Sequence, residues 1–145
     1  MKVREIMTHD PAGCAPEANI RDVAKMMAEN DCGEIPVLDE RSRPVGVVTD
    51  RDIACRVVAQ GKDPDRTAAR DAMSSPVITV TPEDDVADCL DKMEENQVRR
   101  VPVVDESGAC CGMIAQADIA RAASEGDIAE LVRDVSRPGG RASAT

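Results

Sequence analysis

Residues 35–54 read IPVLDERSRPVGVVTDRDIA, and residues 101–120 read VPVVDESGACCGMIAQADIA, so one pattern occurs twice, 66 positions apart. The register holds without a gap over residues 16–54 and 82–120, where 14 of 39 positions are identical. Repetition at one fixed spacing indicates that a single structural unit was duplicated. At roughly 60 residues each copy would bury little surface alone, so we expect the two copies to share a core.

Each copy is predicted to contain the same order of elements, β-α-β-β-α. A short β-prone stretch, clearest at 77–80, precedes a helix whose apolar residues recur at i, i+3, i+4 and i+7. Two apolar runs joined by a turn follow, and they predict adjacent buried strands at 35–38 with 45–48 and at 101–104 with 111–114. A second helix opens at Asp50 or Gln116.

The predicted fold class is α/β, of the α+β type, with two β-α-β-β-α repeats related by a pseudo-two-fold axis and packed as one module. The predicted boundaries are repeat 1 at 1–62, a linker at 63–68, repeat 2 at 69–124, a C-terminal amphipathic helix at 125–136 and a disordered tail at 137–145.

Composition restricts the classes of partner. The net charge of −10 repels phosphate backbones and anionic lipid surfaces, so neither nucleic acid nor a membrane is expected to bind. No apolar run approaches the ~18 residues of a membrane span, and the chain opens on charged residues rather than a signal peptide. Cytoplasmic localisation is therefore expected.

The six cysteines show neither CxxC spacing nor the rhythm of a disulfide framework, which fits a reducing compartment. Three of them lie in or beside apolar patterns and are predicted to be small core residues: Cys32, Cys55 and Cys89. The chain has no Phe, Tyr or Trp, so any bound base must lie between aliphatic side chains and backbone.

The sharpest local signal is the stretch 46–52, where a predicted buried strand turns into a helix. One interpretation is a capping box, with Thr49 as N-cap and Asp52 three residues later. In the second copy Ala115 replaces the threonine, whereas Asp118 keeps the carboxylate. A carboxylate retained without its capping partner favours a second interpretation, in which its two oxygens accept hydrogen bonds from ribose hydroxyls.

The tandem unit, the IPV…DE and VPVVDE strands and the Gly-x-x-Thr-x-x-Asp turn resemble a pair of CBS domains, the Bateman module. The segment MEENQVRRVPVVDE, residues 93–106, is similar to stand-alone bacterial CBS-pair proteins, and the resemblance extends over about residues 1–124. It implies a regulatory, non-catalytic protein that binds AMP, ADP, ATP, S-adenosylmethionine or NAD in two clefts between the repeats. It also implies a homodimer, an unidentified effector protein that reads the ligand state, and no catalytic cofactor.

The same resemblance assigns site residues. It places Thr49 and Asp52 on the ribose of one cleft and Asp118 on that of the other, while Arg100, beside Arg99, meets phosphate. The adenine is expected to lie against Ile78, Val80 and Val98 in the Asp52 cleft, and near Cys14 and Cys32 in the Asp118 cleft.

Two departures from the family pattern predict that the clefts differ. Glu34 stands in the first repeat where Arg100 stands in the second, and it would repel a phosphate in the Asp52 cleft. Ala115 removes a hydrogen bond worth roughly 0.5–1.5 kcal/mol from the other cleft. The Asp118 cleft is therefore expected to favour phosphates.

Three alternatives remain at this level. The chain could be a constitutive dimerisation or partner-binding scaffold whose clefts stay empty. An enzyme acting on nucleotides is disfavoured because no nucleophile stands beside a base. His9 and Cys14 would supply half of a metal site, so no metal is predicted. The neighbouring residues Cys110 and Cys111 begin a predicted strand, in which adjacent side chains point to opposite faces. This geometry disfavours a redox role for the pair.

Overall fold

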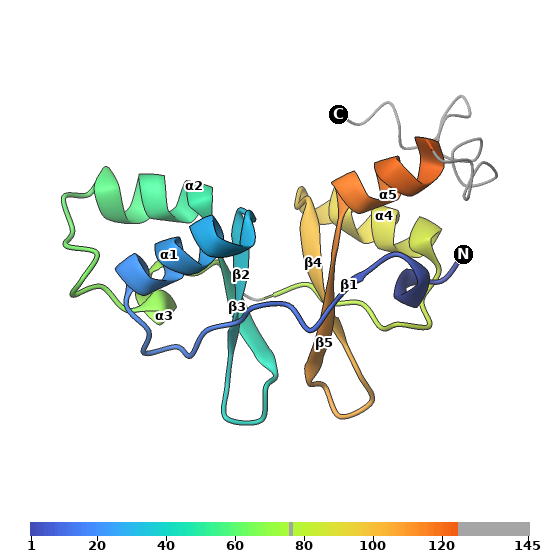
Figure 1. Ribbon diagram of the computed structural model, residues 1–145, viewed down its shortest axis with the longest axis horizontal. Helices are drawn as coiled ribbons and strands as arrows, with labels where there is room; N and C mark the ends of the chain where they lie inside the picture. Colours follow the sequence, from blue (N-terminus) through green and yellow to red (C-terminus); the bar gives the residue numbers. More distant parts are fainter. Residues whose placement is uncertain (76, 125–145) are drawn as a thin grey trace. The chain divides into compact units, whose positions relative to one another are not determined.

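The computed structural model describes residues 1–75 and 77–124 (Figure 1). The helix predicted at 125–136 and the tail predicted at 137–145 lie outside the described residues. In chain order the elements are a 3-10 turn Val3–Glu5, β1 Thr8–His9, α1 Ile20–Asn30, β2 Glu34–Leu38, β3 Pro44–Thr49, α2 Asp50–Asp52 continued by a π-helical stretch Ile53–Val58, α3 Ala69–Ala72, α4 Val86–Asn96, β4 Arg100–Val104, β5 Cys110–Ala115 and α5 Gln116–Ser124.

The chain divides into two units, each with its own core. The first-repeat unit comprises Pro11–Val77 with Ser107–Cys110. The second-repeat unit comprises Met1–Asp10, Ile78–Glu106 and, of the described residues, 111–124. Each unit thus contains the helix–hairpin–helix part of one repeat and the opening segment of the other. The boundaries predicted for the repeats remain predictions.

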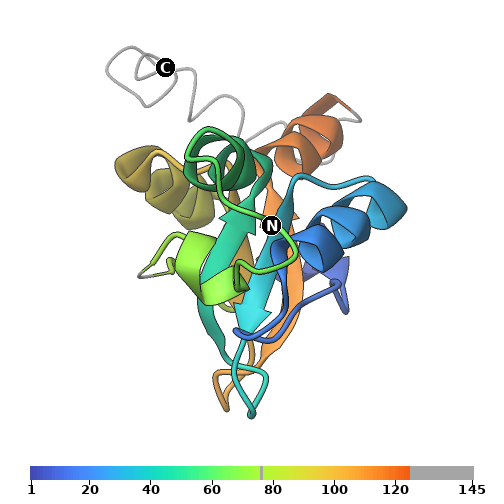
Figure 2. The same ribbon diagram turned by 90° about the vertical axis from the view of Figure 1, so that its left-hand side faces the viewer.

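In the first-repeat unit, β2 and β3 form an antiparallel hairpin in which Glu34 is opposite Thr49. Helices α1 and α3 lie against one face of this hairpin (Figure 2). The start of α1 is capped by the side chain of Asn19, which accepts a hydrogen bond of 2.9 Å from the backbone N–H of Asp22. The apolar face predicted for α1 is buried at Ile20, Val23 and Met27.

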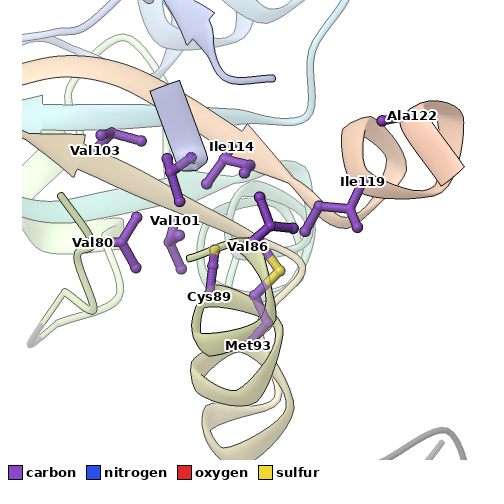
Figure 3. Close-up of a cluster of buried hydrophobic side chains, with 10 residues drawn as sticks. Val80, Val86, Cys89, Met93, Val101, Val103, Ile114, Ile119 and Ala122 are labelled. Carbon is purple, nitrogen blue, oxygen red and sulfur yellow. The ribbon is translucent and has the colours of Figure 1, made fainter. Parts of the chain in front are cut away.

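In the second-repeat unit, the strand order is β1-β5-β4, and β1 pairs antiparallel with β5. The helix α4 buries the face predicted for it, at Val86, Cys89 and Met93. These side chains pack with residues of both long strands and of α5 (Figure 3). The core is aliphatic, with the buried members Val3, Val80, Val86, Cys89, Met93, Val101, Val103, Ile114, Ile119 and Ala122.

The opening segment of each repeat packs in the unit of the other repeat, and one glycine in each unit lets the two backbones come close. In the first-repeat unit the backbone of Ser74 exchanges hydrogen bonds of 3.1 and 2.8 Å with Val47. A Cβ on Gly46 would lie 3.0 Å from the carbonyl oxygen of Ser74 and would also overlap Met73. Glycine at position 46 therefore lets the two backbones approach. In the second-repeat unit Gly112 has the same relation to Met7 and Thr8.

Two sequence-based predictions need correction. The β-prone stretch at 77–80 is not a strand in the described residues; it makes a single parallel bridge, from Val80 to Val103. Cys55 is exposed rather than part of the core, because the helix that starts at Asp50 buries Asp52 and Val57 on its other side. Cys89 is buried as predicted, and Cys32 is half-buried. Within the described ranges, no helix is long and apolar enough to cross a membrane.

Candidate functional site

The first strand-to-helix turn joins β3 to α2 and contains the predicted capping box. The hydroxyl oxygen of Thr49 accepts a hydrogen bond of 3.0 Å from the backbone N–H of Asp52. In return, Oδ2 of Asp52 accepts a bond of 3.0 Å from the backbone N–H of Thr49. The structural interpretation of this pair is thus confirmed.

The carboxylate of Asp52 has two further partners that the sequence did not predict. The hydroxyl of Ser74 lies 3.1 Å from Oδ1 and 3.2 Å from Oδ2. The guanidinium of Arg56 lies 3.6 Å from Oδ1 and donates a hydrogen bond of 3.0 Å to the carbonyl of Met73. The exchanged segment is therefore tied to the Asp52 carboxylate, whose side chain is only 9% exposed.

Sequence signals existed for both partners. Ser74 follows Met73 as Thr8 follows Met7, so a repeated hydroxyl marks this position. Arg56 lies four residues after Asp52, a spacing that brings helical side chains together. What the sequence does not contain is the packing of residues 69–75 on the first repeat.

The residue Glu34 lies at the same end of the first-repeat hairpin. It is opposite Thr49 in the register of β2 and β3, and it is buried. The backbone N–H of Asp50 donates to the carbonyl of Gly33 at 2.9 Å, which holds the start of α2 beside the start of β2. The acidic residue predicted for the Asp52 turn is therefore in the same unit as that turn.

The second turn, between β5 and α5, keeps half of the capping box. Oδ2 of Asp118 accepts a hydrogen bond of 2.9 Å from the backbone N–H of Ala115, whereas the alanine side chain offers no acceptor in return. Asp118 thus keeps one capping bond although Ala115 replaces the threonine, so the loss of the capping hydroxyl does not by itself require a ligand for this carboxylate. Its other partner is Arg121, at 3.4 Å, and the Asp118 side chain is 16% exposed.

The two turns differ in what the exchanged segment contributes. Thr8 pairs with Met113 in the register that Ser74 has with Val47. Within residues 1–75 and 77–124, however, the Thr8 hydroxyl makes no hydrogen bond to Asp118. Among the described residues, Asp118 therefore lacks the hydroxyl donor that Asp52 has, and its side chain is more exposed.

The arginines lie at the same end of the second-repeat sheet as Asp118. The backbone N–H of Gln116 donates to the carbonyl of Arg99 at 2.8 Å, and β4 and β5 are neighbours. The side chain of Arg99 is exposed, whereas Arg100 is half-buried. One unit thus contains the arginine and the carboxylate that were predicted to serve one ligand.

Each predicted adenine contact belongs to a different unit from the carboxylate that was predicted to hold the same ligand. Three of them belong to the second-repeat unit, where Val80 is in the core and the other two pack against it: Ile78, Val80 and Val98. The remaining two belong to the first-repeat unit: Cys14, which is buried, and Cys32. The assignment of these residues to the two ligands remains a prediction.

The described residues contain no group of three or more His, Cys, Asp and Glu side chains suited to a metal ion. His9 is exposed and Cys14 is buried. Cys110 and Cys111 are half-buried, and burial raises the pKa of the Cys111 thiol.

The sequence profile of the CBS domain matches residues 3–58 and again residues 69–125. The chain belongs to the CBS domain family. Its two repeats are CBS repeats, and its structural neighbours are pairs of CBS domains.

Known proteins resemble this CBS pair over most of its length. Hypoxic response protein 1 of Mycobacterium tuberculosis is 33% identical over 135 residues, which cover 93% of this chain and 94% of that protein. A crystal structure of Hypoxic Response Protein I with two coordinated zinc ions has a TM-score of 0.77 and covers 83% and 98% of the two chains. The chain spans a smaller share, 61%, of the length of another curated relative.

Two solved neighbours contain adenosine compounds. The CBS domain protein PAE2072 from Pyrobaculum aerophilum, complexed with AMP, has a TM-score of 0.81 and 31% identity, and the match covers 92% of this chain and 99% of that one. The CBS domain pair of protein MJ0100, in complex with 5-methylthioadenosine and S-adenosyl-L-methionine, has a TM-score of 0.79 and 27% identity, covering 87% and 98%.

Proposed function

We propose that this CBS pair is a regulatory protein, not an enzyme, that binds an adenosine-containing ligand at its strand-to-helix turns. The observation that supports this most is the Asp118 carboxylate, which a backbone hydrogen bond fixes at the start of a helix while its side chain remains partly exposed. A fixed carboxylate can accept hydrogen bonds from two ribose hydroxyls at once.

The second turn is the better candidate for a phosphate-bearing ligand. Arg100 and Asp118 belong to one unit, in which Arg100 begins β4 and Asp118 lies in α5, directly after the neighbouring strand β5. An arginine contact to phosphate is a charge-assisted hydrogen bond, which contributes on the order of 1.5–3 kcal/mol. That gain exceeds the roughly 0.5–1.5 kcal/mol lost with the hydroxyl at Ala115. AMP is therefore the ligand we propose first for this turn.

The first turn is proposed to accept fewer phosphates. A second carboxylate, Glu34, lies opposite Thr49 in the hairpin. A negative charge close to a phosphate group opposes its binding, whereas the same charge favours a ligand with a positive centre. S-adenosylmethionine, which the MJ0100 pair binds, has such a centre.

Signalling is proposed to follow from a shift in population. A ligand that binds one conformation of the pair more tightly increases the share of that conformation. An effector protein would then distinguish the conformations. We also propose a homodimer formed through the helices of the repeats, which light scattering at micromolar concentration would test by reporting twice the chain mass.

A scaffold with empty sites is the alternative, and the occupied carboxylate of Asp52 favours it for the first turn. Titration calorimetry with AMP, ATP, S-adenosylmethionine and NAD separates the two. The protein has no Trp or Tyr, so an absorbance band near 260 nm in a purified sample would reveal co-purified adenine. At least one ligand should release or absorb heat, and silence from all four on folded protein would support the scaffold.

A further inference from the structure

The donors around the two carboxylates differ in kind. Within the described residues, Asp52 accepts hydrogen bonds from the backbone N–H of Thr49 and from the hydroxyl of Ser74, and Arg56 forms an ion pair with it at 3.6 Å. In the same described part of the chain, Asp118 accepts from the backbone N–H of Ala115 and from the guanidinium of Arg121, but from no hydroxyl.

A carboxylate has about four lone-pair sites. A ribose that uses both hydroxyls adds two donors, one to each oxygen. At Asp52 these donors compete with the Ser74 hydroxyl, which lies within hydrogen-bond distance of both oxygens. Among the described residues, no hydroxyl lies in this way at Asp118.

Ser74 is the partner of Asp52 that can leave. The N–H of Thr49 belongs to the backbone and to the capping box, and Arg56 is charged and is also bonded to Met73. The Ser74 hydroxyl is neutral and can leave both oxygens by one rotation about its side-chain bond. The backbone bonds between Ser74 and Val47 are unaffected by that rotation.

We propose that Ser74 is a specificity-determining residue that competes with ligand for Asp52, so that the first turn binds adenosine more weakly than its carboxylate alone would allow. The inference rests on the proposed function, because it presumes that a ribose uses these carboxylates. It makes the two turns unequal for a reason independent of phosphate charge, since Thr8, the counterpart of Ser74, makes no such bond in the described chain.

The test uses adenosine as the probe, because it has no phosphate for Glu34 to repel. Calorimetry is performed on Asp118→Ala protein, in which only the first turn can bind, with and without Ser74→Ala. We expect Ser74→Ala to raise the adenosine affinity about tenfold, which corresponds to about 1.4 kcal/mol. Ser74→Thr, which keeps a hydroxyl, should return the affinity to that of Asp118→Ala alone.

The matched control is Thr8→Ala in an Asp52→Ala background, where adenosine affinity should not change. An affinity that falls or stays constant in Ser74→Ala would overturn the proposal, because a residue that only positions Asp52 would weaken binding when removed. If Asp118→Ala does not bind, adenosine binding that appears on adding Ser74→Ala supports the proposal, and continued silence refutes it. Silence from the unmutated protein towards every adenosine compound would refute the proposed function as well.

Discussion

Replacing Gly46 by alanine should destabilise the first-repeat unit, because the new methyl group meets the exchanged segment. The added Cβ would lie 3.0 Å from the carbonyl oxygen of Ser74 and 2.9 Å from Cγ of Met73. The oxygen must retreat by a few tenths of an ångström, which lengthens its hydrogen bond to Val47, now 3.1 Å. Overpacking of this kind costs about 1–3 kcal/mol. At about 3 °C per kcal/mol for a chain of this size, the melting temperature should fall by about 3–9 °C.

Thermal unfolding followed by circular dichroism measures the effect, and a double-mutant cycle identifies its cause. Met73→Ala removes the side-chain overlap, so the cost of Gly46→Ala should fall by at least about 0.5 kcal/mol in that background. The control is Gly61→Ala, whose methyl group has no atom within 4 Å and whose cost should come only from its φ of +70°. That cost should not depend on Met73. If Gly46→Ala costs the same in the Met73→Ala background as in the unmutated protein, the packing of Met73 against Gly46 is refuted.

Three further predictions concern thiols and a helix cap. Cys55 is exposed whereas Cys14 and Cys89 are buried, so iodoacetamide at neutral pH should alkylate Cys55 first by mass spectrometry; earlier labelling of Cys89 would contradict the packing of α4. Burial raises the pKa of Cys89 to about 12, so the unfolded chain loses this proton first and stability should fall above pH 9, by at most about 1.4 kcal/mol per pH unit. In Cys89→Ala, the free energy of unfolding measured in urea should fall less steeply between pH 9 and 11 than in the unmutated protein. An equally steep fall with pH would exclude this thiol as a cause. Asn19→Ala removes the acceptor for the N–H of Asp22 and should cost about 0.5–2 kcal/mol in urea unfolding, whereas Asn19→Asp, which keeps an acceptor, should cost less.

The secondary structure was largely predictable because its signals are local. The apolar spacing of α1 and α4 and the apolar runs of the hairpins depend only on neighbours in sequence, and the structure buries the residues that they indicated. The prediction that Cys55 lies in the core was wrong because both faces of the helix that starts at Asp50 contain apolar residues. One of them is Val58, which is 67% exposed. Periodicity alone does not say which face is covered.

The exchange of the opening segments was not predictable from the repeat. Two copies of one pattern are equally compatible with each segment packing on its own repeat or on the other. The clearest signal was glycine at corresponding positions, Gly46 and Gly112, but a glycine indicates close approach without naming what approaches. The partner of Asp52 was missed for the same reason, since Ser74 lies 22 residues further along the chain.

The candidate site was predicted from the strand-to-helix turn at 46–52 and from the alanine, Ala115, that replaces Thr49 in the second repeat. The Thr49–Asp52 pair was correctly interpreted as a capping box, while the importance attached to the unpaired Asp118 ignored the backbone N–H that remains when threonine becomes alanine. The capping bond therefore orients the Asp118 carboxylate, as a ligand would require, but gives no independent support for ligand binding. That support comes from the exposure of Asp118, from the position of Arg100 and from the adenosine compounds in related CBS pairs.

The most direct test of the account is a calorimetric titration of AMP into the unmutated protein, Asp118→Ala and Asp52→Ala. We expect the unmutated protein to bind AMP and Asp118→Ala to weaken that binding by at least about tenfold, or about 1.4 kcal/mol. Asp52→Ala should leave most of the affinity intact, because the Ser74 hydroxyl already bonds to that carboxylate and Glu34 is opposite Thr49 in the same hairpin. Equal losses from the two substitutions, or AMP affinity unaffected by Asp118→Ala, would contradict it.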